Sequence, residues 1–165
     1  MKVLGVDPGS RVTGYGVVDW VGSQLTHIDN GCIIPAAKNA LPDRIEEIYR
    51  EMMQVIARFQ PEVLALEQIF VAKNNRSALV LGHARGAIML AGMHSKIPVV
   101  EYGATEVKKA LVGFGAAKKE QMQRMTKTLL GLPEIAMEDA ADALAVAICH
   151  CQSSKLRNLL EGRRT

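Results

Sequence analysis

Aromatic residues are scarce in this sequence, and no stretch of it is apolar for long enough to cross a membrane. Its 165 residues include one tryptophan, three tyrosines and three phenylalanines. A membrane helix needs about 20 consecutive, mostly apolar residues, and the chain has neither such a run nor a signal peptide pattern. The three cysteines are an odd number, which does not suit a disulfide framework. These absences argue against a membrane-spanning or disulfide-stapled secreted protein and predict a cytoplasmic protein with no membrane partner.

A large excess of one charge is also missing, because the net charge is only +3. The distribution of charge is more informative than its total. No acidic residue lies between Glu67 and Glu101 or between Glu106 and Glu120, whereas lysines and arginines occur in both intervals. Basic runs of this kind are often solvated helix surfaces, but they also fit an anionic partner such as nucleic acid.

The length and composition predict one globular domain. The sequence is 48% hydrophobic and 22% charged, and a chain of this size buries roughly 68–70% of its surface on folding. We place the domain over residues 1–152. Residues 153–165 are rich in basic residues, and we expect them to form a flexible tail.

The hydrophobic pattern predicts a mixed α/β sheet with helices on both faces. Three strands come first, and helices then alternate with two further strands. We expect strands over residues 2–7, 12–19, 24–34, 63–67 and 97–100, and helices over 41–60, 74–95, 104–112, 118–130 and from 138 onward.

Four carboxylates stand at positions where local structure does not explain them. Asp7 and Glu67 each end a short apolar strand, and Asp139 and Asp142 lie one turn apart on an alanine-rich helix. Four negative charges brought together repel one another unless cations compensate them. All-oxygen ligands select hard ions such as Mg²⁺ or Mn²⁺, and two such ions can clamp the attacking and leaving oxygens of a phosphoryl displacement.

Five separated motifs resemble the RuvC family of Holliday-junction resolvases. They are GVDPGSRVTGYGVV at 5–18, LALEQIFVAKN at 64–74, GHARGA at 82–87, EVKKALVGFGAAKKEQ at 106–121 and EDAADALAVAICH at 138–150. The resemblance covers roughly residues 1–152 in the same order. It implies a ribonuclease-H-like fold with a five-stranded mixed sheet.

The resemblance also implies an activity and its catalytic residues. Asp7, Glu67, Asp139 and Asp142 match the family's catalytic acids, which would hold two Mg²⁺ ions per site, with Mn²⁺ as a substitute. The activity implied is magnesium-dependent cutting of four-way DNA junctions by paired symmetric nicks in recombination and repair. The products would carry 5′-phosphate and 3′-hydroxyl ends.

Several further residues are predicted to contact DNA. Lys108 and Lys119 match family lysines that contact the scissile phosphate or the backbone beside it. Phe70 matches a base-stacking aromatic of the family, and stacking contributes about 1–3 kcal/mol per base. Lys73 and Arg76 follow the strand that ends at Glu67, where we expect them to hold phosphates.

The family implies partners as well. Its members are homodimers, and small residues in the helix over 77–94, including Gly82 and Gly86, would permit close approach of a second copy. The branch-migration proteins RuvA and RuvB are implied partners, and the bacterial cytoplasm is the implied location.

Three other classes remain as alternatives. Actin-like and sugar-kinase ATPases share the Asp-x-Gly hairpin, but they need two related domains and a chain of about twice this length. YqgF-like nucleases of ribosomal RNA processing match only the first strand and the general acidic layout. A non-catalytic junction-binding module would be expected if one acid were missing, and all four are present.

Overall fold

The structure is a computed structural model that describes residues 1–68 and 75–161, with side chains up to residue 154. Three strands come first, followed by helices that alternate with two more strands. The elements are β1 (Lys2–Asp7), β2 (Thr13–Val21), β3 (Gln24–Ile33), α1 (Leu41–Phe59), β4 (Val63–Glu67), α2 (Asn75–His94), β5 (Val99–Tyr102), α3 (Ala104–Val112), α4 (Lys119–Leu130) and α5 (Glu138–Glu161).

The strands form one mixed sheet in the order β3-β2-β1-β4-β5. Strands β1, β2 and β3 pair antiparallel, whereas β1, β4 and β5 pair parallel. The predicted five-stranded mixed sheet is therefore confirmed. Because β1 and β4 are parallel neighbours at its centre, their final residues lie at the same edge.

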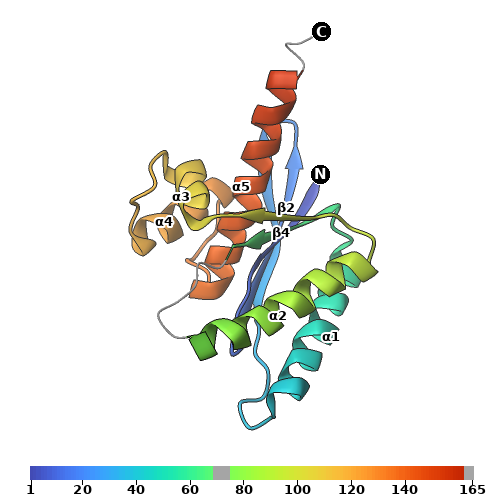
Figure 1. Cartoon of the computed structure of the whole chain (residues 1–165). Coiled ribbons are helices and arrows are strands. Elements are labelled where there is room, and N and C mark those ends of the chain that lie inside the picture. The colour runs from blue at the N-terminus through green and yellow to red at the C-terminus, as the bar shows by residue number, and fades with distance from the viewer. Residues whose placement is uncertain (69–74, 162–165) are drawn as a thin grey trace.

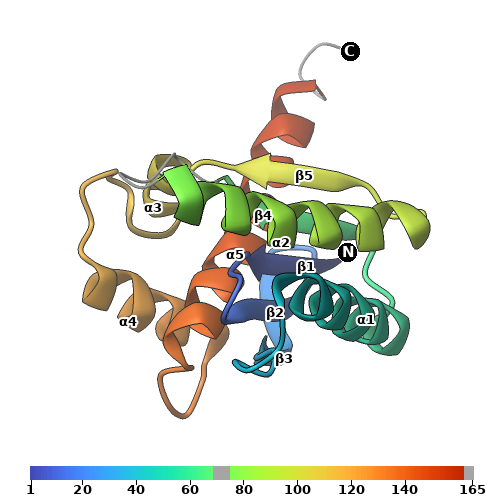
Figure 2. The ribbon, with the colours of Figure 1, turned by 60° about the horizontal axis from the view of Figure 1, so that its bottom comes forward.

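Helices cover both faces of this sheet, as predicted (Figures 1 and 2). Val3 of β1 belongs to a core shared with α3, α4 and α5, whereas Leu4 and Val6 belong to a second core shared with α1 and α2. Burial on both faces accounts for the uninterrupted apolar runs of the central strands.

Strand β5 begins two residues later than the sequence pattern predicts. Helix α2 ends at His94, and Lys96 adopts the left-handed region with a φ of 58°. The Ile97 N–H is already used by the Gly92 carbonyl, and Pro98 has no N–H to donate. Pairing with β4 therefore starts at Val99, opposite Leu64.

Helix α5 crosses the sheet and runs on to Glu161, projecting beyond the strands toward the C-terminus (Figure 1). The domain boundary predicted at residue 152 lies inside this helix, and the flexibility of the segment after it stays a prediction. Within residues 1–68 and 75–161, no helix is both long and apolar enough to span a bilayer.

Candidate active site

Two of the predicted acids meet where the central strands end. Asp7 is the last residue of β1 and Glu67 the last of β4, and the two strands pair in register up to Val6 and Leu66. The Asp7 and Glu67 carboxyl groups lie close enough that each shifts the pKa of the other. Parallel pairing thus joins two carboxylates that are 60 positions apart in the sequence.

Glycines bring the start of α5 close to this edge. Gly14 pairs with Asp7 across the β1–β2 ladder, and a Cβ built on Gly14 would lie 2.0 Å from the backbone oxygen of Asp139. A Cβ on Gly5 would lie 2.1 Å from the backbone oxygen of Ala143. Any side chain larger than hydrogen at these positions would push α5 away from the sheet. The glycines therefore fix Asp139 and Asp142 near the end of β1.

Burial, with added effects from neighbouring carboxylates, raises the pKa values of three of these acids. Burial, followed by the charges of Glu67 and Asp142, raises the pKa of Asp7 to about 8. Burial also raises the pKa of Glu67, although its interaction with Asp7 works in the opposite direction. The pKa of Asp142 is raised by burial despite its contact with Lys119. Negative charge at this edge is therefore undercompensated by the protein itself.

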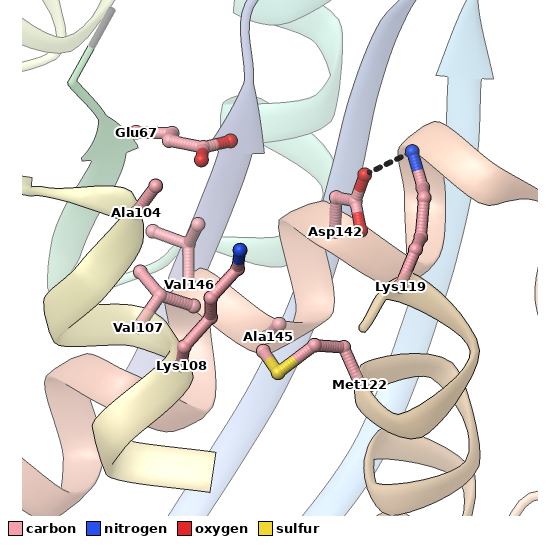
Figure 3. A pocket seen from close by; sticks show the side chains of 9 residues that line it. All are labelled: Glu67, Ala104, Val107, Lys108, Lys119, Met122, Asp142, Ala145 and Val146. Carbon is pink, nitrogen blue, oxygen red and sulfur yellow. Dashed lines mark ion pairs between the residues drawn. The ribbon is translucent and has the colours of Figure 1, made fainter. Parts of the chain in front are cut away.

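Both predicted lysines face this cluster. Lys108 of α3 and Lys119 of α4 line a pocket of about 260 Å³ together with Glu67 and Asp142 (Figure 3). The Lys119 ammonium donates to Asp142 Oδ2 over 3.0 Å and also to Glu138 Oε1. Partial burial alone would lower the pKa of Lys119, but these two hydrogen bonds raise it above its usual value.

Of the three remaining predicted contacts, Arg76 is among the described residues, and it does not line this pocket. Arg76 is exposed in the first turn of α2. Phe70 and Lys73 fall outside the described residues.

Two features of the site go beyond the residues predicted from the sequence. The sequence pattern marks Glu138 only as the start of a helix, although Glu138 shares the Lys119 ammonium with Asp142. The glycines at 14 and 16 alternate along one strand, which is a signal for close backbone approach that sequence alone does provide.

The donor set fits a hard divalent cation in its chemistry. Asp7, Glu67 and Asp142 supply only oxygen atoms, and their raised pKa values indicate negative charge that a cation would relieve. Within residues 1–68 and 75–161, however, no three acidic, histidine or cysteine side chains form a ready-made metal site. An ion bound here would therefore require some of these carboxylates to reorient.

Comparison with known proteins identifies the family. A family model described as crossover junction endodeoxyribonuclease RuvC matches residues 3–150. The chain belongs to this family. A RuvC of Syntrophotalea carbinolica is 54% identical over 97% of this chain and 99% of its own length, and a RuvC of Geobacter metallireducens is 51% identical over 99% and 100%.

Solved RuvC structures have the same fold as this chain. The Thermus thermophilus RuvC structure has a TM-score of 0.87 at 33% identity and covers 94% of this chain and 96% of its own. The same protein in complex with a Holliday junction substrate has a TM-score of 0.90 at 34% identity, with the same coverage. The resemblance, the ribonuclease-H-like fold and the DNA endonuclease class are thereby confirmed. RuvC family nucleases are in general metal-dependent.

Proposed function

We propose that this RuvC family endonuclease resolves four-way DNA junctions at the edge of the sheet where Asp7 of β1, Glu67 of β4 and Asp142 of α5 lie. The observation that carries the proposal is the convergence of Asp7, Glu67 and Asp142 beside Lys108 and Lys119. A pocket that pairs undercompensated carboxylates with lysines can receive both a metal ion and the DNA phosphate.

Asp7, Glu67, Asp139 and Asp142 would together hold two Mg²⁺ ions, with Mn²⁺ as a substitute. When bound, such ions activate water for attack and neutralise the leaving 3′ oxygen, which gives 5′-phosphate and 3′-hydroxyl ends. Asp7 is suited to a central place among the ligands because it touches Glu67 and its pKa responds to Asp142 and Asp139 as well.

Lys108 and Lys119 would bind the phosphates of the DNA backbone. Lys108 and Lys119 lie at the pocket rim on separate helices, where an ammonium group can pair with phosphate oxygens and stabilise charge in the transition state. Stacking by Phe70 and phosphate contacts by Lys73 and Arg76 remain predictions for the stretch that follows Glu67.

Calorimetric titration with Mn²⁺ tests the metal part of the proposal. Two ions per protomer are expected for the native chain, with heat that disappears when the site is already filled by excess Mg²⁺. Failure to bind Mn²⁺ at millimolar concentration would refute the proposed metal site.

We also propose that the chain acts as a homodimer joined through α2. Leu79 is 67% exposed, Leu90 49% and Met93 64%, and all three lie on this helix. Gly82 and Gly86 have open space where a Cβ would stand. An apolar face with room for close backbone approach suits a two-fold contact, and two-fold symmetry would supply one active site for each nicked strand.

Leu79→Glu is expected to weaken the dimer, because it places a charge on the apolar face of α2. Sedimentation should show monomers at concentrations where the native chain is dimeric, and junction cleavage should change from paired nicks to slower single nicks. Val21→Glu is the matched control, because Val21 is also 67% exposed but lies at the end of β2. A Leu79→Glu protein that remains dimeric and makes paired nicks would contradict the proposed interface.

Contacts with RuvA and RuvB and a cytoplasmic location also follow from family membership as proposals. A pull-down with each purified branch-migration protein would test the first of these.

A further inference from the structure

Glu138 and Asp142 share one ammonium group at the edge of the active site. Lys119 Nζ lies 3.0 Å from Asp142 Oδ2 and also contacts Glu138 Oε1. Lys119 is the first residue of α4 and Glu138 the first of α5. The shared ammonium therefore links the beginnings of two helices that are 19 residues apart.

We infer that Glu138 is a positioning residue that holds Lys119 beside the scissile phosphate during cleavage. The inference rests on the proposed roles of Lys119 and Asp142. Asp142 contacts Lys119 through Oδ2, and a cation bound through its other oxygen would draw on the same negative charge and weaken its hold on the ammonium. Glu138 would then be the stronger carboxylate partner that keeps the ammonium at the edge of the pocket.

Contact with Glu138 matters because the Lys119 side chain is long and flexible. Lys119 has a long side chain that is 49% exposed, and holding such a chain in one orientation costs conformational entropy. An anchor that is already in place reduces that loss during the reaction, which raises the rate for bound substrate. The backbone below the side chain is also fixed, because the Lys118 N–H donates to Gln121 Oε1 over 2.9 Å in the first turn of α4.

Because the Glu138 side chain is exposed, a positioning role can be distinguished from a structural one by experiment. Its side chain is 65% exposed, so its replacement leaves the buried cores intact. It also stands near the expected path of the DNA backbone, where its negative charge opposes phosphate. Removing that charge should therefore slow cleavage without weakening junction binding, whereas general damage to the site would reduce both.

The test compares Glu138→Gln with Glu134→Gln, a matched change at another exposed acid in the loop before α5. Single-turnover cleavage at saturating enzyme and Mg²⁺ should be about two- to fivefold slower for Glu138→Gln, the range that an exposed ion pair supports. Junction affinity measured without metal should be equal or tighter. Lysine side-chain NMR should show a slowly exchanging Lys119 ammonium in the native protein that is lost in Glu138→Gln and retained in Glu134→Gln.

A Lys119→Met variant distinguishes failure of the role inferred for Glu138 from failure of the role proposed for Lys119. If Glu138→Gln cuts as fast as Glu134→Gln, or if its Lys119 ammonium signal is unchanged, the positioning role is overturned. A loss of junction affinity as large as the loss of rate would overturn it as well. If Lys119→Met itself cleaves at the native rate, the proposed role of Lys119 fails, and the role of Glu138 fails with it.

Discussion

Asp7→Asn is expected to lower the rate of junction cleavage by at least about a thousandfold, the loss that follows when metal-assisted stabilisation of the transition state is removed. Asparagine keeps the shape of the side chain and can still hydrogen-bond to Glu67. It removes the charge of the acid that contacts Glu67 and responds to two further carboxylates. The measurement is single-turnover cleavage of a synthetic four-way junction with Mg²⁺.

Junction binding separates this chemical effect from a loss of structure. Binding in EDTA should be unchanged for Asp7→Asn near neutral pH, where the pKa of about 8 keeps Asp7 mostly protonated, and equal or tighter above pH 8, where the native Asp7 is charged and opposes the phosphates. Asp19→Asn is the matched control, since Asp19 pairs with Lys2 at the opposite end of the same β1–β2 ladder. Near-native cleavage by Asp7→Asn would show that Asp7 is not a central ligand.

The second large effect is on stability without metal. Burial and the neighbouring carboxylates raise the pKa of Asp7 from its ordinary value of 3.8 to about 8 in the folded protein. Between these pH values the folded state binds more protons than the unfolded state, so the free energy of unfolding falls as pH rises. The penalty is absent below about pH 4 and reaches a few kcal/mol near pH 8, on the scale of 1.4 kcal/mol per pKa unit.

Asp7→Asn should therefore unfold at a higher temperature than the native chain in EDTA, with a difference that grows from pH 5 to pH 8. At this chain length about 1 kcal/mol corresponds to roughly 2–4 °C, so several degrees are expected at pH 8. Saturating Mg²⁺ should reverse the order, because it stabilises the native carboxylate site more than the variant. A lower melting temperature for Asp7→Asn at pH 8 in EDTA would mean that Asp7 is needed for folding.

Asp7 and Glu67 could be placed in one site from the sequence for a simple reason. Each ends an apolar run, and the carboxyl ends of parallel strands meet at one edge of the sheet. The three-residue spacing of Asp139 and Asp142 predicts that they share one face of a helix. It does not predict where that helix packs against the strands. Their approach depends on Gly5 and Gly14, whose contacts with α5 emerge only when the helix is packed on the sheet.

Contacts between long side chains were harder to predict. Lys119 and Glu138 begin different helices, and which of several nearby acids receives the ammonium depends on how α4 and α5 pack. The start of β5 was misplaced because Ile97 and Val99 have the same apolar character. The Ile97 N–H is used in the turn after α2, which periodicity does not reveal.

Strand-cleavage mapping shows whether the chain resolves junctions, with a synthetic four-way junction, a linear duplex of the same sequence and a single-stranded RNA as parallel substrates. We expect Mg²⁺-dependent, symmetric, paired nicks with 5′-phosphate ends on the junction and no comparable cutting of the duplex or the RNA. Binding of the junction without cutting, or preferential cutting of the RNA, would contradict the proposed function.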